Sequence, residues 1–404
     1  MQPGGGDAEW GGNKREGTMS IDEVLQHSVE SGQVAGVTAA AADAGGSIYQ
    51  GAFGRRSLAG PAAMTVDTVF RIASMTKAIT GAACMQMVEQ GKLALDQPAG
   101  EILPFLAEPK VLQGFDDSGQ PKLRPARGVV TLRKLLTHTA GFVYDTWNRD
   151  MNRYAAQTGL PATRTGKLAA LSAPLGFDPG ARWEYGINID IAGRMVEVVS
   201  GQNLERYMQQ HLFGPMGMRD TGFVLRPEWT SRLAQVHARG ADGALTPIDA
   251  LPPAENPEFY AGGGGLFSTA ADYLLFLQAL NQGGALNGQR ILQPETVALM
   301  AQNHMGDLNV LPMQTFNPRM SNDVELFPNM DKKWGLSFLI NTQDVPGRRS
   351  AGSLAWAGIN NTYYWLDPKK QVAGVLMTQV LPFGDATVLG LLDRFEETVY
   401  RTVG

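Results

Sequence analysis

Residues 71–80 of this 404-residue chain read RIASMTKAIT, and they place Ser74 three residues before Lys77. The segment leads into an apolar run with helical spacing, so we expect a helix from Met75 to Gly91. Residues i and i+3 of a helix lie on one face, about one turn apart, so the hydroxyl and the amine are expected to be within reach. The pair is either a reactive centre or the polar edge of an ordinary helix.

The chemistry of the pair depends on a base. A serine hydroxyl is a poor nucleophile until a neighbouring group takes its proton, and a lysine can do so only when it is neutral. Apolar surroundings and the positive potential of a helix N-terminus both lower a lysine pKa. An S-x-x-K match arises about once by chance in a chain of this length, so the spacing alone does not decide. The chain has no G-x-S-x-G elbow. His138, in LLTHTAG, is expected to cap or pack rather than to complete a triad.

Composition excludes several classes of protein. The net charge is −5 with no basic run, which argues against nucleic-acid binding. No stretch approaches 18 consecutive apolar residues, so no membrane span is expected. The single cysteine, Cys84, cannot form an intrachain disulfide, and the five histidines show no metal-ligand spacing. Residues 1–18 are predicted to be a disordered leader with Met19 as the native start. They lack the apolar core of a signal peptide, which points to the cytoplasm.

Strand patterns lie at both ends of the chain, with helical patterns between them. Residues 34–43 and 46–54 are expected to form a hairpin, and 386–403 a closing helix. Three strands are expected over 333–340, 353–367 and 371–380, and further helices over 20–32, 130–141, 187–200, 203–213 and 268–280. We therefore predict an α+β fold whose antiparallel sheet is built from both termini and flanked by helices.

The predicted organisation has two regions. Residues 19–90 and 285–404 form an α/β region that contains the sheet, and residues 91–284 form an inserted, mainly helical region. The active site is expected to lie between the two.

Several segments together resemble the serine β-lactamases and penicillin-binding proteins. SMTK (74–77) is similar to their S-x-x-K, and WEYGINIDIAGRMVE (183–197) resembles their tyrosine-containing second motif. SLAWAGINNTYYWLDP (353–368) resembles the third-motif strand, where β-lactamases have K-T-G and a group of esterases has W-x-G. TLRKLLTHTAGF (131–142) and GGGGLFSTAADY (262–273) are also typical of this superfamily.

The likeness is strongest to the family VIII carboxylesterases, which have a class C β-lactamase fold, and equally to the fungal statin-side-chain acyltransferases. The chain departs from the β-lactamases at three points. Trp356 stands where they have the K-T-G lysine, Asn188 follows Tyr185 by three positions rather than two, and no S-D-N is present. The resemblance therefore favours ester chemistry over efficient β-lactam hydrolysis.

The resemblance implies a role for each matched residue. Ser74 would be acylated, Lys77 and Tyr185 would share its proton, and the amides of Ser74 and Ile359 would form the oxyanion hole. The implied substrate-binding residues are Tyr144, Trp356, Gly358 and Asn188.

The resemblance implies a serine hydrolase that cleaves short- to medium-chain carboxylic esters through an acyl-enzyme. Its substrate would be a small molecule, with no cofactor or metal. The alternatives are an acyltransferase that passes the acyl group to an alcohol, a weak β-lactamase, and a non-catalytic binder on the same fold.

Overall fold

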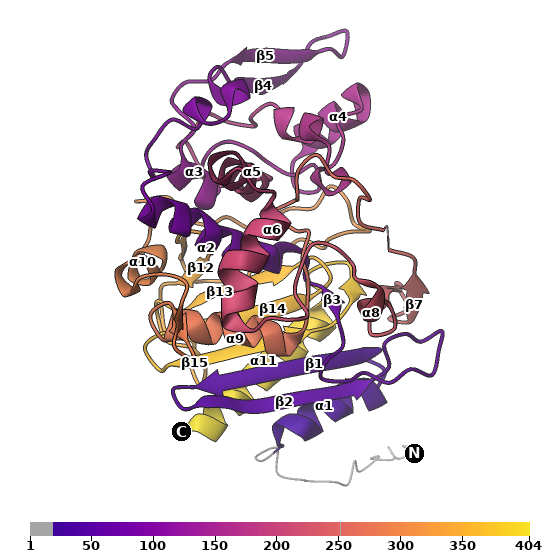
Figure 1. Ribbon diagram of the computed structural model, residues 1–404. Coiled ribbons are helices and arrows are strands. Elements are labelled where there is room, and N and C mark those ends of the chain that lie inside the picture. The colour runs from indigo at the N-terminus through magenta and orange to yellow at the C-terminus, as the bar shows by residue number, and fades with distance from the viewer. Residues whose placement is uncertain (1–18, 251) are drawn as a thin grey trace, which may run out of the picture.

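The computed structural model describes residues 19–250 and 252–404, so the leader predicted for residues 1–18 lies outside the described residues. Its centre is a seven-stranded antiparallel sheet in the order β11-β12-β13-β14-β15-β1-β2 (Figure 1). The strands come from both ends of the chain: β1 (Gly36–Asp43), β2 (Gly46–Gly54), β11 (Lys332–Trp334), β12 (Leu339–Asn341), β13 (Leu354–Gly358), β14 (Thr362–Asp367) and β15 (Val372–Met377). The prediction of an α+β fold with a sheet built from both termini is confirmed.

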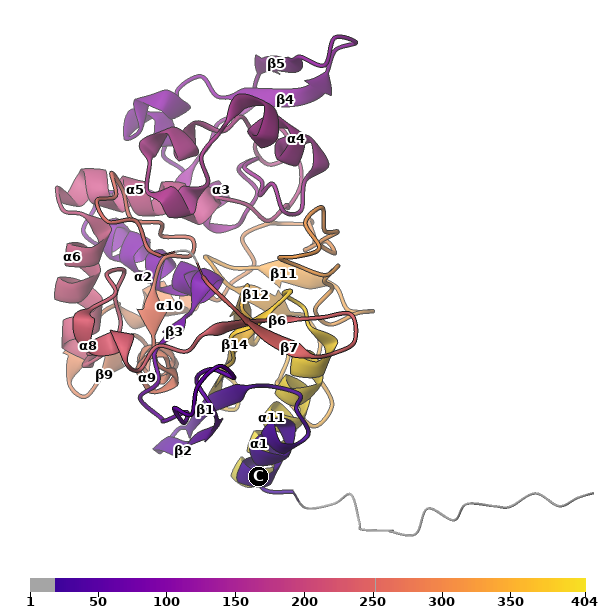
Figure 2. The same ribbon diagram turned by 90° about the vertical axis from the view of Figure 1, so that its right-hand side faces the viewer.

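The two ends of the chain meet where β1 pairs with β15, with Thr38 opposite Met377 and Ala42 opposite Ala373. Both strands are apolar and buried along almost their whole length, because helices cover both faces of the sheet. Helices α1 (Ile21–Glu30) and α11 (Ala386–Val403) pack together on one face, and α9 (Ala270–Asn281) packs on β15 and β1 from the other (Figure 2). Residues 91–284 were predicted to form the helical region, but α9, within that range, makes most of its contacts with the sheet strands β15 and β1.

The prediction of three C-terminal strands was wrong, because five strands of the central sheet form there, followed by the short strand β16 (Val380–Leu381) of another sheet. Residues 333–340 divide into β11 and β12, and residues 353–367 form a hairpin of β13 and β14. The hairpin turns at Asn361, which adopts a φ of 57° and donates its backbone N–H to the Gly358 carbonyl over 2.9 Å. Asparagine tolerates this left-handed conformation better than most residues, which allows a tight turn without glycine at that position.

The helical region surrounds α2 (Thr76–Glu89), which is buried along all but its last two residues and packs on α5 (Asn188–Ser200). The helix predicted over 130–141 is shorter than expected. It ends as α3 (Leu132–Leu136), because the chain reverses at His138, whose φ is 58°. A hairpin of β4 (Lys110–Phe115) and β5 (Pro121–Pro125) stands at the end of this region far from the sheet (Figure 2).

The remaining α-helices and β-strands are short connections. They are α4 (Arg149–Thr158), α6 (Leu204–Met208), α7 (Gly214–Met216), α8 (Pro227–Thr230), α10 (Pro294–Met300), β3 (Phe70–Arg71), β6 (Val236–Arg239), β7 (Leu245–Ile248), β8 (Phe267–Ser268), β9 (Ala285–Leu286), β10 (Gln289–Arg290) and β16 (Val380–Leu381). No helix among the described residues combines the length and the apolar character needed to cross a membrane.

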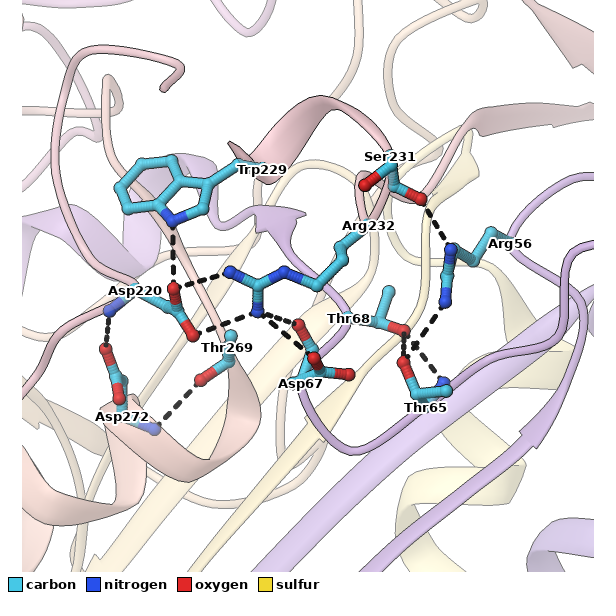
Figure 3. Close-up of polar contacts among 10 residues, drawn as sticks. All are labelled: Arg56, Thr65, Asp67, Thr68, Asp220, Trp229, Ser231, Arg232, Thr269 and Asp272. Carbon is cyan, nitrogen blue, oxygen red and sulfur yellow. Dashed lines mark hydrogen bonds and ion pairs between the residues drawn. The ribbon is translucent and has the colours of Figure 1, made fainter. Parts of the chain in front are cut away.

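A polar cluster centred on Asp220 holds the segment between α7 and β6 against α9 and Asp67 (Figure 3). Arg232 donates to both carboxylate oxygens of Asp220 and also reaches Asp67, while the Trp229 indole N–H donates to Asp220 over 2.9 Å. The backbone N–H of Asp220 donates in turn to Asp272, in the first turn of α9. The bidentate Arg232–Asp220 pair and the hydrogen bond from the Asp220 backbone to Asp272 together hold this segment on α9.

Asp272 is expected to make the stability of the protein depend on pH. Burial raises its pKa to about 6, although hydrogen bonds from Thr221 and the Asp220 backbone oppose this shift. Its pKa in the folded protein lies above that of the unfolded chain. The stability that Asp272 contributes is therefore fully present below about pH 4 and lost as pH rises through about 6. The loss is about 3 kcal/mol at most.

The measurement is urea unfolding at several pH values, compared between the wild type and Asp272→Asn. Between pH 4 and pH 7, the unfolding free energy of the wild type should fall relative to that of Asp272→Asn. A difference that does not vary with pH would contradict the prediction.

Candidate active site

Ser74 lies at the junction between the helical region and the sheet, in the short 3₁₀ turn Ala73–Met75 that precedes α2. It is partly exposed, whereas the residues that follow it in α2 are buried. Ala73 has a φ of 44°, in the left-handed region that costs a non-glycine residue about 1–2 kcal/mol. This sharp turn brings the chain from β3 into α2 and places the serine hydroxyl at the start of a buried helix.

The backbone carbonyls of the two residues before the Ser74 turn hold it against the β13–β14 hairpin and the segment after β15. The Arg71 carbonyl accepts from Gln379 over 3.1 Å and from Asn360 over 3.4 Å. The Ile72 carbonyl accepts from the hydroxyl of Thr362 over 3.4 Å. The end of β13 and the start of β14 therefore pack against the serine turn, although these segments are far apart in sequence.

Lys77 is fully buried one turn after Ser74, as the helical spacing predicted. Its Nζ donates to Ser74 Oγ and to Tyr144 Oη, each over 3.1 Å, and to the Gly263 carbonyl over 2.6 Å. Burial lowers the pKa of Lys77, while the charge of Asp190 acts in the opposite direction. The amine is thus positioned to exchange a proton with the serine hydroxyl.

Tyr185 lies beside both Lys77 and Ser74, with Lys77 Nζ 4.7 Å from the centre of its ring. Its hydroxyl accepts from the Trp356 indole N–H over 3.0 Å. Burial raises the pKa of Tyr185, and hydrogen bonds to Ser74 and Trp356 oppose this shift. The tryptophan on β13 therefore supplies a neutral donor to the phenol oxygen.

Gly358 ends β13 at the point where the strand touches the Ser74 turn. A Cβ added at this position would collide with the Ile72 carbonyl and with the hydroxyl of Thr362. Its glycine is therefore required for close approach of the two backbones. The next amide, that of Ile359, has no protein acceptor within the described part of the chain.

Substituting Gly358 by alanine is expected to push the hairpin away from the Ser74 turn. Overpacking of this kind typically costs about 1–3 kcal/mol of stability. Removing one oxyanion-hole donor typically costs about 100-fold or more in kcat, so the oxyanion role that the family resemblance implies for the Ile359 amide predicts a large fall in ester hydrolysis as well. Thermal unfolding and p-nitrophenyl butyrate hydrolysis measure the two effects. Gly60→Ala is the matched control, since a Cβ at Gly60 meets nothing within 4 Å. Wild-type activity in Gly358→Ala would contradict the prediction.

Tyr144, predicted to bind substrate, contacts Lys77 directly. In addition to its bond to Lys77, its backbone N–H donates to the Tyr185 carbonyl over 3.2 Å. Trp147 packs edge-on against both tyrosines, with ring centres 5.8 Å from Tyr144 and 5.4 Å from Tyr185. Two phenols therefore flank Lys77.

Asn188 was predicted to bind substrate. It is fully buried, and its side-chain amide contacts other residues of the protein. Its amide donates to the Phe142 carbonyl over 2.9 Å and lies 3.1 Å from His138 Nδ1. His138 is also buried and packs on the Tyr185 ring, with a centroid separation of 4.8 Å. Both residues support the segment that carries the tyrosine.

Asp190 was not predicted to be a site residue, although it lies within the second motif (183–197). It is 1% exposed, and its Oδ1 accepts the Gly263 backbone N–H over 2.9 Å. A carboxylate between the apolar residues Ile189 and Ile191, five residues after Tyr185, was the signal that could have identified it. Within residues 19–250 and 252–404, His, Cys, Asp and Glu side chains form no group of three or more that could hold a metal ion.

The antiparallel sheet, the inserted helical region and a serine–lysine pair at their junction together define the β-lactamase/transpeptidase-like fold. The beta-lactamase family matches residues 21–395. The chain belongs to this family, and it is an enzyme of the hydrolase and acyltransferase type. This confirms the family resemblance predicted from the motifs.

Relatives and solved structures cover nearly the whole chain. Monacolin J acid methylbutanoyltransferase from Aspergillus terreus is 33% identical over 402 residues, covering 94% of this chain and 95% of that protein. Lovastatin esterase from Penicillium rubens is 32% identical over 399 residues, covering 94% and 98%. The structure of unliganded simvastatin synthase from Aspergillus terreus superposes with a TM-score of 0.83 at 33% identity, covering 95% and 97%.

Proposed function

We propose that this protein is a serine carboxylesterase or acyltransferase that forms a covalent acyl-Ser74 intermediate from short- to medium-chain carboxylic esters. The observation that carries the proposal is the contact of 3.1 Å between Ser74 Oγ and the fully buried Nζ of Lys77. A partly exposed serine beside a desolvated amine is the arrangement that nucleophilic catalysis requires.

In the proposed acylation, Ser74 Oγ attacks the ester carbonyl and its proton passes to the Lys77–Tyr185 pair. Burial lowers the pKa of Lys77 and raises that of Tyr185, so the pair can hold one proton in two ways. The proton rests either on the phenol, beside a neutral amine, or on the amine, beside a phenolate. The pair then gives the proton to the departing alkoxide, which leaves as the alcohol.

The amides of Ser74 and Ile359 are proposed to stabilise the negative charge on the tetrahedral oxygen. The free Ile359 amide and the close packing of Gly358 on Ile72 support this role. Backbone donors of this kind cost no reorganisation during the reaction. Tyr144 and Trp356 are proposed to line the substrate-binding site beside Ser74.

The second half of the reaction decides between the two activities. A water molecule that attacks acyl-Ser74 gives a carboxylic acid, whereas an alcohol gives a new ester, and both lose their proton to the same pair. The relatives include proteins named as a methylbutanoyltransferase and as an esterase, so the comparisons favour acyl transfer in general and neither acceptor in particular. Trp356 offers no cation for a β-lactam carboxylate, so we propose esters as the substrates.

The deciding experiment is hydrolysis of p-nitrophenyl butyrate with increasing concentrations of an added primary alcohol. Release of p-nitrophenol reports acylation, and the ratio of butyrate to butyrate ester reports the acceptor. An alkyl phosphonate should in parallel add to Ser74, as shown by peptide mass spectrometry. Modification at another residue, or fast nitrocefin hydrolysis, would contradict the proposal.

A further inference from the structure

The Lys77 amine is buried with three hydrogen-bond acceptors, and none of them carries a formal charge. They are the Ser74 hydroxyl, the Tyr144 hydroxyl and the Gly263 carbonyl. An ammonium group removed from water is costly unless a negative charge lies near it. A compensating carboxylate is therefore to be expected close to Lys77.

Asp190 provides this negative charge, and the Gly263 residue links its carboxylate to the Lys77 amine by two hydrogen bonds. Its Oδ1 accepts the Gly263 N–H over 2.9 Å, and the Gly263 carbonyl accepts Lys77 Nζ over 2.6 Å. Asp190 Oδ2 is buried and makes no hydrogen bond of ordinary geometry among the described residues. Burial raises the pKa of Asp190, while the charge of Lys77, the Gly263 N–H and the Tyr144 hydroxyl all favour its ionised form. A side chain at Gly263 would collide with this carboxylate, so the glycine is required for their contact.

The other titratable groups that face Lys77 cannot replace Asp190. Tyr144 and Tyr185 present their rings to Nζ at 5.2 and 4.7 Å, and burial raises the pKa of each. His138 lies behind Tyr185, and burial followed by the charge of Lys77 lowers its pKa, so it is neutral. Among the described residues, Asp190 is thus the carboxylate whose charge raises the pKa of Lys77.

The geometry points to Asp190 as a positioning residue that acts through the Gly263 peptide to hold Lys77 as an ammonium ion beside Ser74. This inference rests on the proposed function, because it concerns the proton that the Lys77–Tyr185 pair shares. Asp190 favours the form with the proton on Lys77 and a phenolate on Tyr185, so that the phenol oxygen takes the serine proton.

Asp190→Asn tests this inference, because the amide keeps the shape and the Oδ1 acceptor but removes the charge. The readout is the rate at which an alkyl p-nitrophenyl phosphonate modifies Ser74, measured from pH 5 to 10. Without the carboxylate, the more positive protonation states of the Lys77–Tyr185 pair become less stable. Both limbs of the pH profile should therefore move to lower pH by about one unit or more.

The control is Asp272→Asn, which removes another buried carboxylate from the first turn of a helix, α9 rather than α5. It should leave the limbs of the profile in place. A merely structural role for Asp190 would lower the rate at every pH without moving either limb, and that result would overturn the inference. Failure of the phosphonate to modify Ser74 in the wild type would instead overturn the proposed function.

A second measurement needs no variant at Asp190. In wild-type protein labelled with ¹³Cε-lysine, burial should make the Lys77 resonance titrate apart from exposed lysines. If Asp190 supports the ammonium form, this resonance should show a substantial ammonium fraction near neutral pH. A resonance that remains that of a neutral amine down to about pH 6 would also overturn the inference.

Discussion

Replacing Ser74 with alanine is expected to abolish turnover of p-nitrophenyl butyrate, with a loss in kcat on the order of 10⁵-fold or more. The change deletes the atom that we propose to bond with the acyl group, so neither hydrolysis nor transfer to an alcohol can proceed through it. The Lys77 amine keeps its acceptors at Tyr144 and Gly263, so the cluster should remain intact. Initial rates with the ester, and peptide mass spectrometry after phosphonate treatment, measure the effect.

The effect must be separated from a general loss of structure. Ser74 is partly exposed and donates no hydrogen bond that closes the fold, so we expect thermal unfolding of Ser74→Ala within a few degrees of the wild type. Ser47→Ala, on the exposed side of the edge strand β2, is the matched control and should retain full activity. Wild-type turnover by folded Ser74→Ala would exclude the acyl-enzyme.

Features set by local spacing could be predicted from the sequence. Ser74 and Lys77 face one another because a helix repeats every 3.6 residues, and the capping box at Ser20 starts α1 at Ile21. The first hairpin follows from two apolar runs around a glycine turn. The sheet order could be inferred only in outline, from strands at both ends of the chain.

Features that depend on distant partners could not be predicted. The Gly263 carbonyl is 186 residues from Lys77 in sequence, and Tyr144 is 67 residues from it. No periodicity relates such positions, so the family motifs supplied Tyr185 and left Asp190 unrecognised. The β13–β14 turn was missed for another reason. Its left-handed residue is Asn361, and a run without glycine at that point has the pattern of one long strand.

The two phenols beside Lys77 give the second large prediction, since only one of them is proposed to take the serine proton. Tyr185 Oη receives the Trp356 N–H over 3.0 Å, and its hydrogen bond with Ser74 lowers its pKa against the effect of burial. Tyr144 Oη accepts from Lys77 over 3.1 Å, and burial followed by the charge of Asp190 raises its pKa. The charge of Asp190 is the second-largest cause of the raised pKa of Tyr144 but the smallest of the causes that act on Tyr185, so Tyr144 is the poorer candidate for a phenolate.

We therefore expect Tyr185→Phe to lower kcat/KM by about 10³–10⁴-fold, within the range for loss of a general base. Tyr144→Phe removes one acceptor from Lys77 and should cost about tenfold, in keeping with a single hydrogen bond. The two variants make the same chemical change within one aromatic cluster, so each controls for the packing loss of the other. Phosphonate labelling rates isolate the acylation step. If Tyr144→Phe were the more damaging variant, the base would be Tyr144, and the Trp356 donor would act on substrate position rather than on the proton.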